Sequence, residues 1–278
     1  MPLTSSRFTS SQTLQRVAAN AAKLALGSTG RAVHLLQMAL IDLGYAFPLS
    51  IGNPNYSPDG IYGNETAQVV KQFQKDCRTL VQDGVVGKNT IHELDRRFVA
   101  PLHQVRLHFR SLALANVPFD RSLRNAETMF GQYGIKIVFA SGESLRLTPA
   151  EAKMFEKIDQ SCVWELSDGE LKTLHTLGSR APATDIVVYY VTRFAKSSVG
   201  GCGGHVKNRP ACTIAAHAFG WDTAHEVCHV LLGSSFSPVH VEDRRNLMFP
   251  HSRRESSAPV LTDRQVAQIR RSACCSRI

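Results

Sequence analysis

The sequence predicts a two-domain protein: a small all-α domain of three helices, then an α+β domain in which a mixed sheet carries one long helix. Its 278 residues exceed the ~100–200 residues of a typical single domain. A repeated turn-and-helix motif fills the first part of the chain, and apolar strand-like runs alternate with amphipathic helices in the rest. The expected boundaries are a flexible or partly helical lead-in over 1–22, a helical domain over 23–98, a linker over 99–115 and the α+β domain over 116–278.

Composition and charge narrow the classes of partner. Hydrophobic residues make up 43% of the chain and charged residues 20%, which is typical of a globular protein with a sizeable core. No apolar run approaches the ~18–20 residues that a membrane-spanning helix needs, so we expect no membrane span. The net charge of +9 favours an anionic partner: nucleic acid, a membrane surface or an anionic cell-wall polymer. No nucleic-acid-binding motif accompanies the charge, so we expect no nucleic-acid partner.

The N-terminal segment lacks the apolar stretch of a secretory signal peptide. Removal of a leader, export without a leader, and retention inside the cell each fit that observation. The chain has seven cysteines and no Cys-x-x-Cys pair, which argues against a cysteine zinc ribbon. Cys202 and Cys212 either close a short loop through a disulfide or remain free thiols, and both alternatives stay open.

Two copies of a turn motif, DGxxGxxT, lie in the first domain at 59–66 and 83–90. Each copy predicts a tight turn that leads into a helix, because its first glycine can adopt the positive φ that such a turn requires. The turns begin with Asp59 and Gly60, and with Asp83 and Gly84. Apolar residues recur at helical spacing in three segments, which predicts three helices: Val33, Leu36, Leu40 and Leu43; Val69, Val70 and Phe73; Ile91 and Leu94.

Together these residues resemble the three-helix peptidoglycan-binding domain of bacteria over about 24–98. The matching residues, in chain order, are Gly30, Val33, Leu36, Gln37, Gly44, Tyr45, Asp59, Gly60, Gly63, Phe73, Gln74, Asp83, Gly84 and Gly87. The resemblance implies that peptidoglycan or another anionic cell-wall polymer is the ligand of this domain. The loop over 47–58 is longer than in the family pattern and would reshape the glycan-facing surface.

The second domain alternates helices and strands, which is typical of a layered α/β or α+β fold. The expected elements, in order, are a helix over 121–134 closed by Gly134, a strand over 135–140, a helix over 151–160, strands over 185–194 and 211–219, a helix over 221–233, and a final helix over 261–275 capped by Thr262.

His225, Glu226 and His229 form an HExxH motif in the segment WDTAHEVCHVLLG. On a helix, residues four apart lie on one face, so both imidazoles can bind one zinc ion at ~2.0–2.1 Å. Glu226 projects to the same side, where its carboxylate can take a proton from zinc-bound water and pass it to the leaving amine. The motif therefore predicts Zn(2+) as the cofactor and hydrolysis of a peptide bond as the reaction.

The residues after this helix resemble those of the metzincin zinc peptidases. Gly233 ends the helix, His240 follows it, and Met248 lies in a Leu-Met-aromatic-Pro turn similar to the Met-turn of that family. The resemblance implies that His240 is the third zinc ligand, once the segment 234–239 loops out, and that Met248 forms a hydrophobic floor below the imidazoles. Asp243 and Glu242 are the alternative third ligands, and either would give a site of two histidines and one carboxylate.

Residues before the long helix are candidates for substrate contact. The glycines of GGCGGH (200–205) let the backbone approach a substrate closely or form a mobile lid. His205 is a candidate for substrate or second-metal binding, with an ordinary loop histidine as the alternative. The resemblance to metzincins implies that ACTIAAH is an edge strand that pairs with extended substrate. Its candidate contacts are Cys212, Thr213 and Ile214.

Three functions fit these patterns. The first is a zinc metallopeptidase that is targeted to the bacterial cell wall and cuts peptidoglycan peptides, because both domains would then act on one material. The second is a zinc endoprotease that cuts protein substrates, with the N-terminal domain as a wall anchor only. The third is a non-catalytic wall-binding protein with a structural zinc. Glu226 argues against the third, because a structural site has no use for a base.

A wall-directed enzyme without a signal peptide fits a phage lysin or an antibacterial effector that a secretion machine delivers to a rival's periplasm. The expected location is therefore the periplasm or the cell wall, reached by secretion or delivery. We expect a monomer, and an effector would add an immunity or inhibitor protein to its partners.

Overall fold

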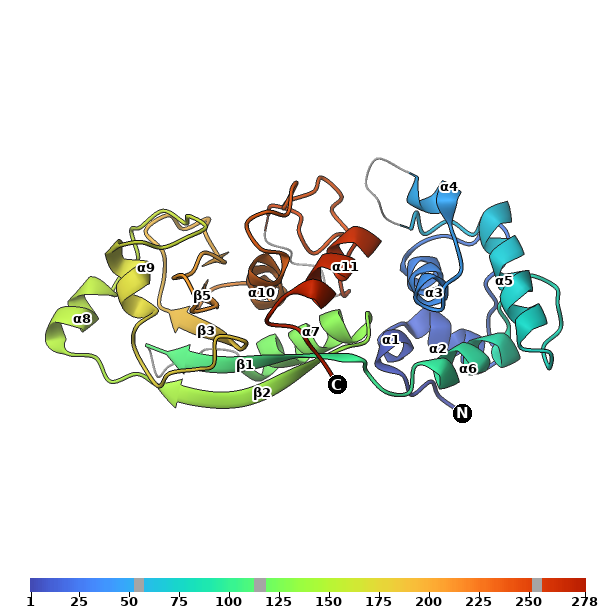
Figure 1. The fold of residues 1–278 in the computed structure, drawn as a ribbon, viewed down its shortest axis with the longest axis horizontal. Coiled ribbons are helices and arrows are strands. Elements are labelled where there is room, and N and C mark those ends of the chain that lie inside the picture. The colour runs from blue at the N-terminus through green and yellow to red at the C-terminus, as the bar shows by residue number, and fades with distance from the viewer. Residues whose placement is uncertain (53–57, 113–118, 252–256) are drawn as a thin grey trace. The chain divides into compact units, whose positions relative to one another are not determined.

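The computed structural model describes residues 1–52, 58–112, 119–251 and 257–278, which form two compact units (Figure 1). The first unit contains Met1–Leu102 together with Phe130–Ile135 and Val260–Val266, and the remaining segments form the second. The expected architecture, helical at first and then a mixed sheet with helices, is confirmed. Across the described ranges, no helix is both long and apolar enough to cross a membrane.

Short and medium helices build the first unit. They are α1 (Ser6–Thr9), α2 (Gln12–Ala18), α3 (Arg31–Asp42), α4 (Pro48–Ile51), α5 (Asn64–Asp76) and α6 (Lys88–Arg97). The helices α3, α5 and α6 are the three that the sequence predicts. Helix α4 lies in the long loop over 47–58, of which residues 53–57 are outside the described ranges.

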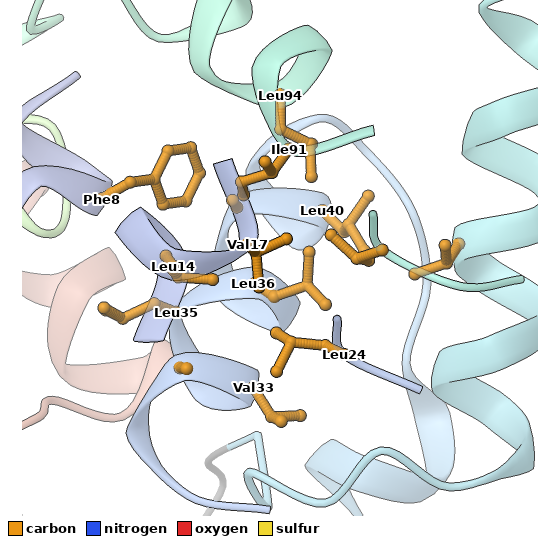
Figure 2. Packing of buried hydrophobic residues seen from close by; sticks show 14 of the residues in the cluster. Phe8, Leu14, Val17, Leu24, Val33, Leu35, Leu36, Leu40, Ile91 and Leu94 are labelled. Carbon is orange, nitrogen blue, oxygen red and sulfur yellow. The ribbon is translucent and has the colours of Figure 1, made fainter. Parts of the chain in front are cut away.

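The helices of the first unit share one apolar core. Figure 2 shows side chains from α1, α2, α3 and α6 gathered in it. Of the two alternatives for residues 1–22, the partly helical one agrees with α1 and α2, whereas a flexible segment does not, because Phe8, Leu14 and Val17 are fully buried in this core. A serine side chain also accepts a hydrogen bond from the backbone at the start of both α1 and α2, which stabilises these short helices.

Each DGxxGxxT turn is closed by a buried glutamine. Gln37 Nε2 donates to Asp59 Oδ1 at 2.8 Å, and Gln37 Oε1 accepts from Gly60 N at 3.0 Å. In the second turn, Gln74 Nε2 donates to Asp83 Oδ1 at 3.0 Å, and Gln74 Oε1 accepts from Gly84 N at 2.9 Å. The first glycines of the two turns have φ of 68° and 71°, the positive values that the sequence predicts. The repeat therefore encodes one turn structure twice.

Replacing Gln74 by leucine should lower the free energy of unfolding by about 1–3 kcal/mol, because the backbone N–H of Gly84 and the Asp83 carboxylate lose a buried partner. Urea unfolding measures this loss. Gln72→Leu is the matched control, since Gln72 lies on the same helix with an exposed side chain. Equal stability of the two variants would show that the turn does not need its glutamine.

A mixed sheet forms the centre of the second unit. Its strands are β1 (His103–Ser111), β2 (Ile135–Ser144), β3 (Ile186–Val191), β4 (Gly201–Cys202), β5 (Ala211–Ala215) and β6 (Ser276–Arg277). The order is β2-β1-β3-β5-β4, and β6 pairs with β1. Figure 1 labels β1, β2, β3 and β5 of this sheet. Strands β1, β3 and β5 are parallel, whereas β4 runs antiparallel to β5.

Strand β1 corrects the linker expected over 99–115. Val105, Leu107 and Phe109 alternate along this strand and are all buried. That period of two is typical of a strand with one face in the core. Residues 113–118, which include the end of the expected linker, lie outside the described ranges.

Helices alternate with the strands of this sheet along the chain. They are α7 (Phe119–Gly131), α8 (Pro149–Met154), α9 (Gly169–Leu174), α10 (Asp222–Leu232) and α11 (Asp263–Arg271). Gly134 follows α7 with φ of 68°, and the Thr262 side chain accepts from Gln265 N at the start of α11, as the sequence predicts. Helix α10 packs against β5, β3 and β4. All of its residues are buried except His225, which is half-buried.

Candidate metal centre

Helix α10 positions three of the predicted site residues. His225, Glu226 and His229 lie in the middle of this helix. The helix packs against β3, β4 and β5 of the sheet. Gly233 follows the helix with φ of 76°, a conformation that glycine adopts readily at a helix end. The chain then returns to place His240 beside the two imidazoles of α10.

The three imidazoles converge through their Nε2 atoms. The Nε2 of His229 lies 3.1 Å from the Nε2 of His225 and 3.1 Å from that of His240. The remaining pair, His225 and His240, is separated by 3.4 Å. Two nitrogens bound at ~2.0–2.1 Å to a tetrahedral zinc ion lie about 3.3–3.4 Å apart. The spacing of the three nitrogens therefore fits one such ion.

The protonation state of the imidazoles also suits metal binding. Burial lowers the pKa of His225 to about 4 and that of His229 to about 2, so both rings are neutral at pH 7 and keep a lone pair. Neutral imidazole nitrogens are the donors that zinc and other divalent transition metals prefer. In the described part of the chain, these two residues and His240 form the cluster that could hold a metal ion.

The turn around Met248 orients one of the rings. The carbonyl oxygen of Leu247 lies 2.7 Å from His225 Nδ1. Because a carbonyl only accepts, His225 carries its proton on Nδ1 and leaves Nε2 free for a metal. The turn is itself held by Asn246, whose Oδ1 accepts from the backbone N–H of Met248 at 2.8 Å. Met248 is fully buried.

Glu226 lies beside the imidazoles and lines the same cleft, with its side chain nearly buried. Burial, with a smaller contribution from the negative charge of Asp222, raises the pKa of Glu226 to about 8. A divalent cation at the imidazoles would favour the carboxylate and lower this pKa again. Glu226 is therefore placed to exchange a proton near neutral pH.

The glycines around β4 press against α10. A Cβ on Gly201 would lie 2.6 Å from Glu226 Cγ, and a Cβ on Gly203 would lie 2.3 Å from His229 Cβ. Both distances are shorter than atoms in contact allow, so only glycine fits. The GGCGGH segment thus brings its backbone close to the site side chains themselves.

A cleft of about 760 Å³ contains the site. The three histidines and Glu226 line it, together with the glycines next to β4 and the aromatic residues Trp164, Phe219 and Trp221. The indole of Trp164 packs edge-on against His229, with ring centroids 6.2 Å apart. The cleft can therefore hold a peptide-sized ligand against the proposed metal.

Asp243, one of the alternative ligands, does not join the histidines. Its carboxylate binds Arg245, with Oδ2 3.1 Å from Nη2. Among the described residues, the potential metal group contains His240 and neither Asp243 nor Glu242. The loop over 234–239 is long enough to bring the third histidine back to the helix.

The interpretation of β5 as a substrate-pairing edge is wrong. Strand β5 pairs with β3 on one side and with β4 on the other, so neither backbone edge is open to a substrate. Cys212, Thr213 and Ile214 are buried and do not line the cleft. The last strand of the sheet is β4. His205 lies next to the cleft glycines, with Nδ1 3.3 Å from the carbonyl oxygen of Gly203, but is not part of the lining.

The pairing of the cysteines differs from both alternatives that the sequence left open. Cys202 forms a disulfide with Cys162, and Cys212 is free and buried. The sequence did not indicate this pairing because the two cysteines are 40 residues apart. Only the fold brings the segment around Cys162 next to β4.

The segment that contains the two glutamine-closed turns matches a known protein family. Residues 29–94 match the family model "Putative peptidoglycan binding domain". That match confirms the resemblance stated for the N-terminal helices. Among solved structures, archaemetzincin from Methanopyrus kandleri is similar to this chain, at 12% sequence identity and a TM-score of 0.37. The similarity covers 60% of this chain and 94% of the archaemetzincin chain.

Outside the peptidoglycan-binding-type domain, sequence reasoning missed parts of the site. The Leu247 carbonyl is a backbone group, so no side-chain pattern marks it. Trp164 lies far from the HExxH motif in the chain and carries no motif of its own. The glycines of GGCGGH were noticed, but their contact with α10 depends on the sheet order.

We expect His240→Ala to weaken zinc binding by more than the 10–100-fold that the loss of an outer-shell partner typically costs, because a converging nitrogen is removed. Competition with a chelating dye measures the affinity. Asp243→Asn should leave the affinity within a few-fold of wild type. The opposite ranking of the two variants would support the site of two histidines and one carboxylate.

Proposed function

We propose that this protein is a zinc metallopeptidase that hydrolyses peptide bonds in the bacterial cell wall. The observation that carries the proposal is the convergence of three imidazoles beside a buried carboxylate in one cleft. His225, His229 and His240 would hold zinc through their Nε2 atoms. When bound, zinc supplies a Lewis acid that polarises the scissile carbonyl and makes water easier to deprotonate.

Glu226 is the proposed general base. Its carboxylate takes a proton from the attacking water and delivers that proton to the leaving amine. Burial supports this role, because it keeps the pKa of Glu226 higher than that of an exposed carboxyl, so that the group can return the proton. The carboxyl also lies against the glycine backbone of β4, which limits its rotation.

Peptidoglycan peptides are the proposed substrate. The match of residues 29–94 to a peptidoglycan-binding family supports attachment to the wall, and the net charge of +9 fits its anionic polymers. Attachment would raise the local concentration of wall peptides at the cleft without strong intrinsic affinity. A protein of this kind would act in the periplasm or the wall as a lysin or an antibacterial effector.

Digestion of purified sacculi tests the proposal. Zinc-loaded protein should release soluble muropeptides, whose masses identify the cut bond. The same protein with Glu226→Gln should release none. Cleavage of a protein substrate with no release from sacculi would support the endoprotease with a wall anchor. If the protein pellets with sacculi and cleaves neither substrate, a non-catalytic wall-binding protein with a structural zinc would be the better account.

A further inference from the structure

One wall of the cleft is a segment that we call the strap, residues 158–166. Backbone hydrogen bonds hold its two ends: Ala195 N donates to Ile158 O at 2.7 Å, and Leu166 N donates to His205 O at 3.0 Å. The part between these ends is largely exposed. The strap residues that line the cleft are Cys162, Val163 and Trp164.

A disulfide ties the middle of the strap to the active-site strand. It joins Cys162, which is exposed, to Cys202 of β4, which is 1% exposed. The glycines on either side of Cys202 press against α10. Two residues after Cys162, the indole of Trp164 packs against His229. The disulfide therefore links an exposed wall of the cleft to the strand that packs on the helix of the metal site.

The strap also lies directly on the glycine segment. A Cβ on Gly204 would lie 1.9 Å from the carbonyl oxygen of Val163, so the two backbones are in contact at this point. Near the first end of the strap, Glu170 Oε2 accepts hydrogen bonds from the backbone N–H groups of Asp159 and Gln160. The backbone of Trp164 is held by a hydrogen bond, since His205 N donates to Trp164 O at 3.2 Å. The disulfide is the covalent bond that holds the strap against β4 at Cys162, next to Val163.

We propose that the Cys162–Cys202 disulfide is a redox switch for the cleft: the disulfide form holds the strap closed and active, and the dithiol form releases it. The change of activity rests on the proposed peptidase function, whereas the movement of the strap does not. In the dithiol form, the strap keeps its backbone hydrogen bonds at Ile158, Trp164 and Leu166 but loses the covalent tie at its centre. Val163 then moves away from the glycine segment, the indole of Trp164 loses its fixed position beside His229, and the substrate loses one wall of its binding site.

The chemistry is thiol–disulfide exchange. Two thiols of the chain react with the disulfide of an oxidoreductase, forming the Cys162–Cys202 bond and giving two thiols on the oxidoreductase, with no net loss of protons. The reverse reaction needs a dithiol reductant. Cys162 is exposed and is the sulfur that such a partner can attack first, followed by release of Cys202.

The direction of the switch fits a protein that acts on the wall. A reducing cytosol would keep the two cysteines as thiols and the cleft open, whereas an oxidising periplasm or cell surface would form the disulfide. The producing cell would therefore hold the protein in its less active form. The free cysteines Cys212, Cys228, Cys274 and Cys275 are buried, so a reductant or oxidant reaches Cys162 more easily.

The first test measures the strap without any need for turnover. Hydrogen exchange is followed over residues 159–166 and 200–205, in the disulfide protein and after reduction with a phosphine, which is oxidised to the phosphine oxide. Reduction should speed exchange in these two segments and leave helix α10 protected. Reoxidation with oxidised glutathione should restore the slow exchange. Unchanged exchange in both segments after complete reduction, verified by alkylation and mass spectrometry, would overturn the proposal.

The second test measures the consequence for activity. Cys162→Ser and the reduced wild type should both lose about 10- to 100-fold in kcat/KM, chiefly through KM, while zinc content stays that of the disulfide protein. Cys77→Ser is the matched control, because Cys77 is a free cysteine of the first unit, and it should leave kcat/KM unchanged. Equal kcat/KM for oxidised, reduced and Cys162→Ser protein would contradict the switch. If no substrate is cleaved by any form, the proposed function fails, and the exchange experiment still decides the switch.

Discussion

We expect Glu226→Gln to keep its zinc and to turn over substrate about 10²–10⁴-fold more slowly than the wild type, the range typical of losing a general base. Glutamine has nearly the shape of glutamate, so it should fit between α10 and the glycines of β4 where the carboxyl now lies. Its amide cannot take a proton from water. The three imidazoles keep their positions, because their contacts do not involve Glu226.

The measurement is kcat for cleavage of a soluble peptide that contains the wall bond identified by the sacculus digestion. Zinc content is determined on the same sample. Glu156→Gln is the matched control, since Glu156 is an exposed glutamate of the same unit with 75% of its side chain accessible. The control should have wild-type kcat. A Glu226→Gln protein that retains both zinc and full turnover would remove Glu226 from the mechanism and leave another group to activate water.

The second large effect is expected for Gly203→Ala. The added methyl would lie 2.3 Å from His229 Cβ and 3.0 Å from its Cγ, so β4 and α10 must separate. Overpacking of this kind typically lowers the free energy of unfolding by about 1–3 kcal/mol. The displacement also moves the imidazole of His229, one of the proposed zinc ligands, so zinc affinity should fall together with stability.

Thermal unfolding with and without zinc, combined with a zinc titration, measures both losses. Gly142→Ala is the matched control in β2, where the added methyl would meet only the ring of Phe139 at 3.4 Å. That variant should unfold close to the wild-type temperature. If Gly203→Ala has wild-type stability and zinc affinity, the close contact between β4 and α10 is absent in solution.

Local patterns predicted much of this structure. The HExxH spacing needs only the periodicity of one helix, and α10 has the expected bounds with His225 and His229 on one face. The two DGxxG turns are also local, because each is closed by a glutamine of the helix before it. In both cases a few residues within one or two elements determine the geometry, so sequence reasoning succeeds.

The errors arise where distant segments meet. Phe8, Leu14 and Val17 are buried only because α3 and α6 cover them, and the polar residues between them favoured a flexible segment. Strand β4 has two residues and is surrounded by glycines, so its sequence is typical of a loop. The resemblance to metzincins implied that β5 is the edge strand, and no sequence pattern marked β4 as the strand that covers it. The partner of Cys202 was missed for the same reason, since it depends on tertiary structure.

The glycines next to β4 have a consequence for selectivity. Gly200, Gly201, Gly203 and Gly204 leave one part of the cleft lining without side chains. Peptide groups offer the same N–H and C=O pattern to any chain that lies along them, so in the proposed peptidase this part would distinguish the direction of a substrate chain and not its residues. Preference for particular residues would come from the side chains of the lining, of which Trp164, Phe219 and Trp221 are the large aromatic ones. Different residues would therefore determine the orientation of the substrate and the preference for its residues. A library of variants at the three aromatic positions should change which residues are preferred, while the substrate chain keeps its direction in the cleft.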